Sequence, residues 1–355
     1  MFDTLITILV SLLAFGFLIF IHEFGHFITA RIFGVTVTEF SIGMGPKLMW
    51  YDSKKSGTRY SLAMLPIGGF VAMAGEDGES DDPNAFNKKP AWQRFIITAA
   101  GAFVNIVFGF LAMFLIVGMI KIGGTTVGRF STNEEMLEMG ESVDLTDRTS
   151  SVLKVGDVIL SVEGKKVYIA DELSYEIMRH GDKPVDLVIE RDGVVMELND
   201  VSFPKVTDQG QVFGVLDFRV YEKEKTFGNF FSISFRKTGL VLRMCWESIF
   251  DLITGRYSFA AVSGPVGISG AIGDAFSAGF LSLLNIIVII SINLGFMNLL
   301  PIPALDGGRL IVLFVEMVFR KKLPERVEAM INTVGLAILL GLSVLIMVKD
   351  IFTLF

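Results

Sequence analysis

Four long apolar runs dominate this 355-residue sequence and limit the folds that it can adopt. The runs cover approximately residues 5–27, 95–120, 280–300 and 334–348. A helix of about 20 predominantly apolar residues crosses the hydrocarbon core of a bilayer. The chain is 52% hydrophobic and only 19% charged, whereas soluble domains are usually about one-quarter charged. We therefore expect a polytopic α-helical membrane protein with four transmembrane helices, and not a soluble enzyme or a disulfide-stapled secreted domain.

The charged residues are distributed unevenly between the segments that separate these runs. Residues 123–226 carry 21 acidic and 12 basic residues, although the whole chain has a net charge of only −7. Lys and Arg gather in residues 31–94, which hold eight of them, and between the third and fourth runs, which hold five. Basic residues beside membrane spans favour the cytoplasmic side. We expect both basic segments in the cytoplasm, and both termini and the acidic insert outside it. No basic face indicates a nucleic-acid partner.

The cytoplasmic segment at residues 31–94 is predicted to contain β-structure. It is rich in β-forming residues over 36–50 and 59–73, and glycines interrupt both stretches. The apolar character of these stretches indicates short strands that dip against the membrane. Protein must then cover their backbone, because lipid offers no hydrogen-bond partners.

The acidic insert has the pattern of an independent domain. Residues 152–162 form a turn that leads into an alternating strand, residues 170–179 have helical spacing, and residues 184–190 alternate again. A length of about 90 residues is enough to form one hydrophobic core. We expect a small α/β domain here.

The segment at residues 227–254 is amphipathic. It is rich in Phe, Leu and Ile, but Arg236, Arg243 and Glu247 share one helical face because seven and four residues separate them. Such a helix is typical of the membrane interface, and a helix that crosses the bilayer is the alternative. We expect the interfacial placement.

Two of the three histidines lie in the motif His22-Glu23-Phe24-Gly25-His26. Residues four apart lie on one helix face, so both imidazoles can reach one metal ion. Glu23 lies beside them and can accept a proton from an attacking water. The motif lies about 25 Å along the first helix, and ionisable groups at such depth are costly unless they serve a function. We therefore expect a metal site, and not a polar helix end.

A zinc site needs a third protein ligand, and a catalytic site leaves a fourth position open. His180 belongs to the insert, across the membrane from His22 in the expected topology. Asp306 is the better candidate, because it follows the third run and so reaches the same side as His22; the alternative is an acidic helix cap. Pro301 and Pro303 interrupt the helix before Asp306 and free backbone groups that would hold an extended substrate.

Taken together, these motifs resemble the site-2 protease family of intramembrane zinc metalloproteases, in its bacterial RseP/RasP type. The resemblance covers nearly the whole chain. It rests on His22 to His26, on residues 39–48, 65–71 and 86–95, on Ser263 to Ile268 and on Asn298 to Gly307. The length of the insert fits a single PDZ domain. The chain departs from the family at Gly101-Ala102, because Gly-Pro is usual before the asparagine that is Asn105 here.

The resemblance implies one Zn²⁺ ion per chain, held by His22, His26 and Asp306, with Glu23 as the catalytic base. Asn298 would hold the substrate or its oxyanion. The cytoplasmic loop would be a membrane-reentrant β element that pairs with an unwound substrate. Four of its glycines would bind that substrate: Gly43, Gly45, Gly68 and Gly69.

The function that the resemblance implies is cleavage of transmembrane segments in membrane-anchored substrates during regulated intramembrane proteolysis. Anti-sigma factors and signal-peptide remnants are the expected kinds of substrate. The protein would be a multi-pass protein of the bacterial cytoplasmic membrane. Its PDZ domain would lie outside and bind a peptide or a substrate ectodomain, and its active site would lie near the cytoplasmic side.

The expected segments follow the order of the chain. They are a first span (1–30), a cytoplasmic loop with the β element (31–94), a second span (95–122), the PDZ domain (123–226), an interfacial helix with a linker (227–279), a third span (280–310), a cytoplasmic loop (311–333) and a fourth span (334–355).

Two other functions fit parts of the sequence. A membrane scaffold would recruit a partner through the PDZ domain and use zinc only for structure, but Glu23 beside an open fourth position argues against it. A metal transporter would use His22, His26 and Asp306 as a site within the membrane. It would need further ligands in the second and fourth runs, which contain no histidine or acidic residue. We expect a protease.

Overall fold

The computed structural model describes residues 2–76, 78–137, 143–208, 211–256, 262–321 and 323–353. The chain folds into two compact units. The first comprises Met1–Met113, Val241–Ser248 and Val262–Phe355, and the second comprises Phe114–Leu240 and Ile249–Ala261.

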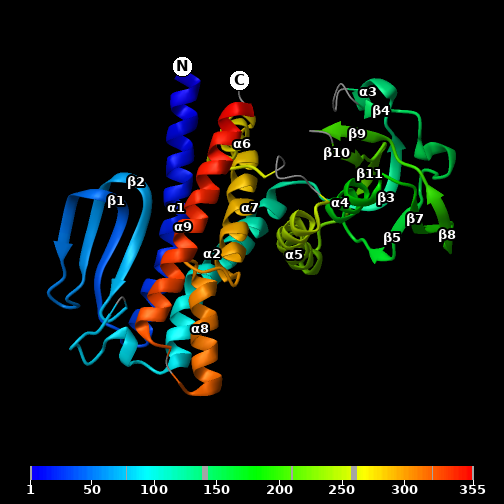
Figure 1. The fold of residues 1–355 in the computed structure, drawn as a ribbon. Coiled ribbons are helices and arrows are strands. Elements are labelled where there is room, and N and C mark those ends of the chain that lie inside the picture. Colours follow the sequence, from blue (N-terminus) through cyan, green and yellow to red (C-terminus); the bar gives the residue numbers. More distant parts are fainter. Residues whose placement is uncertain are drawn as a thin grey trace. The chain divides into compact units, whose positions relative to one another are not determined.

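Long apolar helices form the framework of the first unit (Figure 1). Within the described residues, four helices are long and apolar enough to cross a membrane: α1 (Phe2–Ile32), α2 (Ala91–Met119), α7 (Phe280–Leu299) and α9 (Glu325–Thr353). They overlap the four expected runs, and α9 begins well before the fourth run. Only 6% of the most apolar 18-residue stretch of α9 is buried within the protein. Such a large exposed apolar surface is unfavourable in water and is accommodated by the lipid of a bilayer.

There are two shorter helices, α6 (Pro265–Ala278) and α8 (Asp306–Phe319). Helix α6 lies within the expected linker, and α8 covers the end of the expected third span and the start of the loop after it. The carboxylate of Asp350 on α9 caps α6, because its Oδ2 accepts hydrogen bonds from the N–H groups of Gly264 and Gly267 at 2.9 and 3.0 Å. The hydroxyls of Ser11 and Ser269, 2.8 Å apart, join α1 to α6. These contacts give α6 a fixed place beside both membrane helices.

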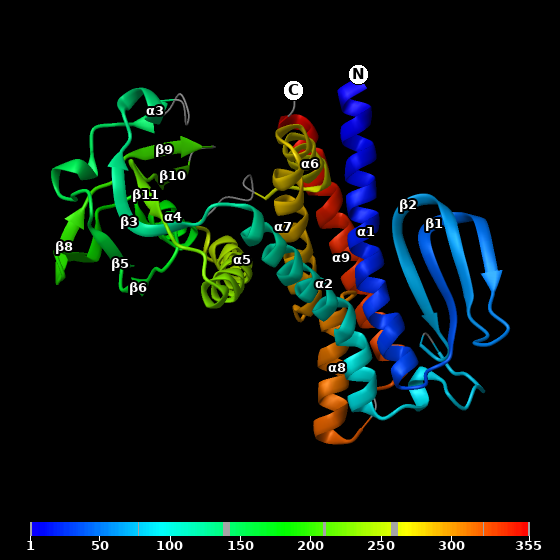
Figure 2. The ribbon, with the colours of Figure 1, turned by 180° about the vertical axis from the view of Figure 1, so that it is seen from behind.

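The cytoplasmic loop of the sequence analysis contains two long strands, β1 (Val37–Asp52) and β2 (Arg59–Met73). They pair antiparallel and lie beside α1 (Figures 1 and 2). The strands bend at Gly43, Gly45 and Gly68, whose φ angles are +85°, +90° and +83°. Glycine adopts such angles without the steric cost that a Cβ atom brings.

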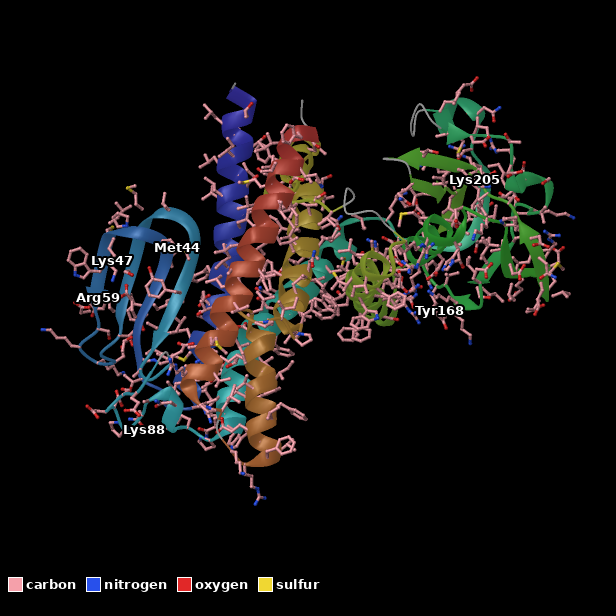
Figure 3. All side chains as sticks on the ribbon, in the orientation of Figure 1. Met44, Lys47, Arg59, Lys88, Tyr168 and Lys205 are labelled. Atoms are coloured by element: carbon pink, nitrogen blue, oxygen red, sulfur yellow. The ribbon has the colours of Figure 1, made fainter. Side chains whose placement is uncertain are left out.

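The bends let the beginning of β1 pair on both of its sides. Phe40 pairs with Tyr60 on one side and with Val71 on the other. Residues 69–73 therefore form an outer edge of this sheet. The opposite hairpin carries exposed side chains, among them Met44, which is labelled in Figure 3.

A buried apolar cluster fixes this sheet to α1 and α2. The short 3₁₀ helix η1 (Phe86–Lys88) contributes to it. The buried members are Ala30, Val35, Val37, Phe40, Val71, Met73, Phe86 and Ile97.

In its described residues, the second unit contains two β-sheets and helix α4 (Ala170–His180). One sheet has the strand order β11-β3-β5-β7-β8, with β6 paired to β5, and the other has the order β10-β9-β4. The strands are β3 (Gly123–Phe130), β4 (Val143–Asp144), β5 (Val158–Val162), β6 (Lys165–Lys166), β7 (Val185–Arg191), β8 (Val194–Val201), β9 (Lys205–Asp208), β10 (Gln211–Gly214) and β11 (Phe218–Glu222). The short helices are α3 (Asn133–Leu137) and η2 (Thr149–Ser151).

The core of the second unit follows the alternation read from the sequence. Strands β5 and β7 and helix α4 lie where two strands and a helix were expected. Their inward side chains form one buried cluster with side chains from β3, β8 and β11. Its members are Val127, Leu153, Ile159, Val162, Val167, Leu173, Ile177, Val185, Leu187, Ile189, Val201, Phe203 and Phe218.

A buried ion pair closes the turn that precedes β5. Asp157, with its side chain 1% exposed, accepts hydrogen bonds from the guanidinium of Arg191 and from the N–H of Lys154, all at 2.7 Å. Burial by itself would raise the pKa of Asp157, but these hydrogen bonds outweigh it and hold the pKa below its usual value.

Helix α5 (Phe227–Thr254) begins at Thr226, whose hydroxyl caps it by accepting the N–H of Asn229. Within the second unit its polar side lies along α4. The ion pairs are Lys237–Asp171 at 2.7 Å, Arg236–Glu172 at 3.4 Å and Arg179–Asp251 at 2.8 Å. Phe231, Phe235 and Phe250 are exposed on the helix. The helix is amphipathic as expected, and its interfacial placement stays a prediction.

Candidate metal centre

His22 and His26 lie one turn apart on α1, and both side chains are buried. Asp306 comes from a distant part of the chain, at the first residue of α8. Its Oδ2 lies 3.1 Å from Nε2 of His22 and 3.4 Å from Nε2 of His26. The two Nε2 atoms are 3.2 Å apart. Among the described residues, these three form the group whose donor atoms could share a metal ion.

The three distances fit one zinc ion. Zinc binds nitrogen and oxygen at about 2.0–2.2 Å, mostly with tetrahedral geometry. The edge of a tetrahedron is about 1.6 times the distance from centre to corner, so the ligand atoms should lie about 3.3–3.6 Å apart. The observed 3.1, 3.2 and 3.4 Å are close to one face of such a tetrahedron. The fourth corner is then left open, as catalytic zinc requires.

Gly101 of α2 keeps space free beside the donor atoms. A Cβ atom at this position would lie 2.4 Å from Nε2 of His26 and 2.8 Å from Nε2 of His22. Gly25 of α1 is packed as closely, since a Cβ there would lie 2.5 Å from the carbonyl oxygen of Ala100. Small residues let helix backbones approach one another in this way. The Gly101-Ala102 sequence thus keeps α1 and α2 in close contact without a proline.

The second nitrogen of each histidine ring faces α2. Nδ1 of His26 lies 2.9 Å from the carbonyl oxygen of Ile97, which can only accept. Nδ1 therefore carries the proton, and Nε2 offers a lone pair to a metal. Nδ1 of His22 faces the side-chain amide of Asn105 at 3.4 Å. Asn105 was not among the expected site residues, and the signal that could have indicated it is its place as a polar residue within an apolar run.

Asp306 reaches the histidines because the chain turns sharply between α7 and α8. Pro301 and Pro303 lie in this turn and prevent α7 from continuing. Gly307 is packed against the same turn, and a Cβ there would lie 1.9 Å from the carbonyl oxygen of Leu300. A glycine is therefore required directly after Asp306.

Glu23 is half-buried on α1, and its side chain reaches the outer edge of the β1–β2 sheet. Its Oε2 accepts a hydrogen bond from the N–H of Val71 at 3.2 Å. Gly69 borders the same place, since a Cβ there would lie 3.8 Å from Cγ of Glu23 and 2.8 Å from the carbonyl oxygen of Ser41. The carboxylate thus lies between the paired histidines and an edge strand.

The remaining residues from the sequence analysis lie farther from this centre or in another part of the chain. Gly43, Gly45 and Gly68 lie at the bends of the sheet, and neither Glu23 nor a histidine is among their nearest neighbours. Asn298 is half-buried near the end of α7, just before the turn that leads to Asp306. His180 lies in the second unit at the end of α4, 3.6 Å from Glu176.

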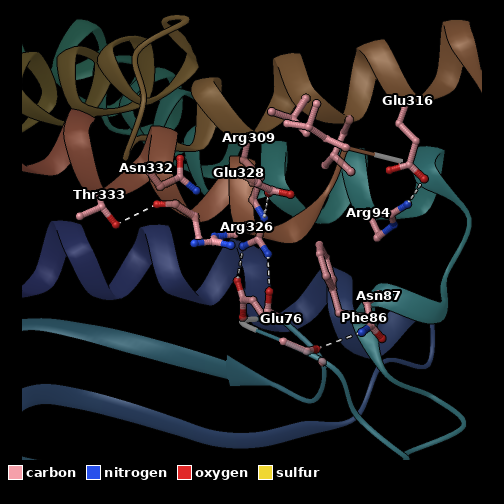
Figure 4. Close-up of a pocket in the computed structure, with 16 residues that line it drawn as sticks. Glu76, Phe86, Asn87, Arg94, Arg309, Glu316, Arg326, Glu328, Asn332 and Thr333 are labelled. Carbon is pink, nitrogen blue, oxygen red and sulfur yellow. Dashed lines mark hydrogen bonds and ion pairs between the residues drawn. The ribbon is translucent and has the colours of Figure 1, made fainter. Parts of the chain in front are cut away.

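A separate cavity of about 570 Å³ lies in the first unit between the loop after β2, the start of α2, α8 and the start of α9 (Figure 4). Arg309 crosses it and donates hydrogen bonds to the side chain and the carbonyl oxygen of Glu76, both at 2.8 Å. Arg94 pairs with Glu316 of α8 on another wall. Arg309 lies one turn after Asp306, so these contacts hold α8 against the loop that follows the edge strand.

Comparison with known proteins gives the family of this chain. The model of Peptidase family M50 matches residues 10–342. A protein of Clostridium acetobutylicum named "Putative zinc metalloprotease" is 35% identical over 345 residues, which cover 97% of each chain. A protein of the same name from Fusobacterium nucleatum is also 35% identical, over 98% of this chain and 99% of its own length. The Regulator of sigma-W protease RasP of Bacillus subtilis is 27% identical, over 98% of this chain and 99% of its own.

These matches confirm the resemblance that the motifs suggested. They also establish zinc as the cofactor, and the donor atoms described above are those that zinc prefers. Together with four helices that are long enough to span a bilayer, they indicate a multi-pass protein of a bacterial membrane. The chain belongs to peptidase family M50, the intramembrane zinc metalloproteases.

Proposed function

We propose that this protease cleaves a peptide bond within the transmembrane segment of membrane-anchored proteins, with zinc held by His22, His26 and Asp306. The observation that carries the proposal is the near-equilateral triangle of the three donor atoms, with sides of 3.1, 3.2 and 3.4 Å. The chemistry that bound zinc supplies is Lewis-acid polarisation of the scissile carbonyl and of the attacking water.

Glu23 is the general base in this proposal. Its carboxylate is one residue from His22 on the same helix and is held by the N–H of Val71. A general base must lie within hydrogen-bond reach of the proton that it takes. Glu23 takes a proton from the attacking water and returns it to the leaving nitrogen of the cleaved bond.

The edge strand at residues 69–73 is the proposed docking place for the substrate. A helical substrate hides its carbonyl groups in intrahelical hydrogen bonds, so it must unwind before cleavage. An added strand at a sheet edge replaces those bonds. The contact between Val71 and Glu23 supports this edge, because a strand paired there passes beside the base. Gly69 borders Glu23, whereas Gly43, Gly45 and Gly68 shape the bends that create the edge.

Asn298 is proposed to support the developing oxyanion or the substrate backbone. It lies on the last turn of α7, directly before the chain turns towards Asp306. The proline-containing turn that follows exposes backbone groups that would otherwise be bonded within a helix. An amide donor preorganised at such a place stabilises charge that develops in the transition state.

Residues 123–226, within the second unit, are proposed to be a PDZ domain outside the cytoplasm that binds a peptide or a substrate ectodomain. Its two β-sheets with α4 and the acidic balance of this segment support the proposal. Helix α5 is proposed to lie in the membrane interface, because its polar side bonds to α4 and several of its Phe side chains are exposed. The active site would then face the cytoplasmic side.

Regulated intramembrane proteolysis is the proposed process. The similarity to a protein named as a regulator of sigma-W supports anti-sigma factors as one kind of substrate. Signal-peptide remnants are the other kind, because they also present a single apolar helix with a short tail. The expected topology of two basic cytoplasmic segments supports a site near the inner face.

The test of the proposal is the Glu23→Gln variant with a membrane-anchored test substrate. The change keeps the shape of the side chain and removes its basicity, so cleavage should fall by at least about 100-fold, while zinc remains bound. Glu134→Gln, an exposed change in the second unit, is the matched control and should cleave like the wild type. Cleavage by Glu23→Gln at the wild-type rate would rule out the proposed mechanism.

The ligand set is tested separately by zinc content. Asp306→Ala removes one corner of the triangle and should release zinc on dialysis. Asp274→Ala, at an exposed position on α6, is the control and should keep one zinc per chain. A tightly held zinc in Asp306→Ala would show that the third ligand is another residue.

A further inference from the structure

Asn105 is a polar residue enclosed at the junction of three helices. Its side chain is 0% exposed on α2. Its carbonyl oxygen accepts a hydrogen bond from the hydroxyl of Ser291 on α7 at 2.9 Å. Gly295 of α7 is packed closely against the same turn, since a Cβ there would lie 2.6 Å from the carbonyl oxygen of Ala102. These contacts exclude solvent and leave the side-chain amide facing α1.

The only hydrogen-bond contact of this amide among the described residues is with Nδ1 of His22, at 3.4 Å. In the arrangement described, Nδ2 faces the ring, and the buried Oδ1 has no hydrogen-bond partner. A buried polar atom without a partner costs about 1–3 kcal/mol. The two ends of an amide have nearly the same shape, so its orientation is decided by the hydrogen bonds that it makes.

Zinc ligation by His22 decides between the two orientations. If Nδ2 donates to Nδ1, the ring proton must reside on Nε2, which points at Asp306 and at Nε2 of His26. A protonated Nε2 has no lone pair for a metal. If the amide is turned over, Oδ1 accepts the proton of Nδ1, Nε2 offers its lone pair, and the buried oxygen gains a partner. His26 is already set in this way by the carbonyl oxygen of Ile97.

We propose that Asn105 is a positioning residue of the zinc site, which holds His22 in the Nδ1–H form through its Oδ1. This inference rests on the proposed ligand set and adds the group that orients one of its members. Partners of this kind fix the ring and the tautomer of metal-binding histidines. A neutral amide is favoured at this position, because burying a charged carboxylate within the helix bundle costs more free energy.

The test compares zinc affinities of the full chain in detergent, measured by competition with a chromophoric chelator. Asn105→Leu keeps the branching of the side chain and removes the acceptor, so affinity should fall by about 10–100-fold. Asn105→Asp restores an acceptor for Nδ1–H and should stay within about threefold of the wild type. Ser291→Ala is the matched control, because it removes the neighbouring hydrogen bond and leaves the amide in place. It should bind zinc like the wild type.

The absorption spectrum of the Co²⁺-loaded protein is a second readout, since it reports the geometry of the ligands. It should change in Asn105→Leu and return in Asn105→Asp. Wild-type affinity in Asn105→Leu would overturn the proposal, and so would an Asn105→Asp variant as weak as the Leu variant. If the Leu variant fails to fold, Asn105→Ala, which cannot clash, gives the same comparison. The proposed function fails independently, if Glu23→Gln cleaves normally or Asp306→Ala keeps its zinc.

Discussion

The N–H of Val71 donates a hydrogen bond to Oε2 of Glu23 at 3.2 Å. This bond joins α1, the helix with the His22-to-His26 motif, to the outer strand of a β-sheet. The two bonded residues are 48 positions apart in the sequence. The proposed base and the proposed substrate-binding edge are therefore parts of one arrangement, and a change at either should affect the other.

The Val71 N–H can be removed without loss of the side chains around it. Val71→Pro deletes this donor at an outer edge, where proline is tolerated because the N–H serves no ladder bond. We expect a fall in the cleavage rate of up to about 100-fold, with unchanged zinc content, because Glu23 is misplaced and the proposed docking edge loses one donor. Val71→Ala keeps the N–H and is the control. A Val71→Pro enzyme of normal rate would show that this bond does not position the base.

Gly101 offers a test of the space beside the proposed zinc ligands. Gly101→Ala places a methyl group 2.4 Å from Nε2 of His26 and 2.8 Å from Nε2 of His22, and Cβ atoms in proteins essentially never come within 3.0 Å of another atom in this way. We expect loss of bound zinc, measured by elemental analysis of the purified protein. Gly341→Ala lies on α9 with nothing within 4 Å of the new Cβ, so it should keep its zinc. Full zinc content in Gly101→Ala would contradict the described packing of α2 on α1.

Asp350 offers a test of how α6 is held. Asp350→Ala removes the acceptor for two N–H groups at the start of α6. The free energy of unfolding should fall by about 0.5–2 kcal/mol, the usual cost of a lost cap. Thermal unfolding in detergent measures this change. Asp350→Asn keeps an oxygen acceptor and should lose less stability, and equal losses in the two variants would argue against capping.

The Asp157–Arg191 pair predicts how the stability of the second unit depends on pH. The pKa of Asp157 is lower in the folded protein, against the effect of burial, because Arg191 and Lys154 bond to its carboxylate. Its contribution is therefore fully present above the unfolded value of about 3.9. It is lost as the pH falls through the lower folded value.

Arg191→Gln should destabilise the second unit by about 1–3 kcal/mol at neutral pH, and the difference from the wild type should shrink below about pH 4. Hydrogen exchange of the β5 and β7 amides in the full chain measures both effects. Arg219→Gln, an exposed change on β11, is the control. A difference that stays constant down to low pH would show that Asp157 is not the titrating partner.

Local patterns in the sequence were enough to predict the four membrane helices and the metal-binding motif. Apolar runs of sufficient length predict membrane helices, because each backbone N–H and C=O group in lipid must form a hydrogen bond within its own segment. The spacing of His22 and His26 places both imidazoles on one helix face by helix geometry alone. The strands at β5 and β7 followed from alternation. Helix α6 was missed, because its Gly- and Ser-rich sequence resembles a linker.

The tertiary structure alone decided which distant residues meet at the site. Asp306 is far from His22 in the sequence. It contacts His22 because the prolines and Gly307 allow the backbone to turn sharply after α7. Asn105 reaches His22 because glycines on α1, α2 and α7 let the helices approach closely. A hydropathy pattern acts along one segment, whereas such contacts depend on the fit of surfaces from several segments. The sequence by itself determined the membrane helices and the shared helix face of His22 and His26. Packing determined the position of Asp306, the contact of Glu23 with the edge strand and the partner of His22.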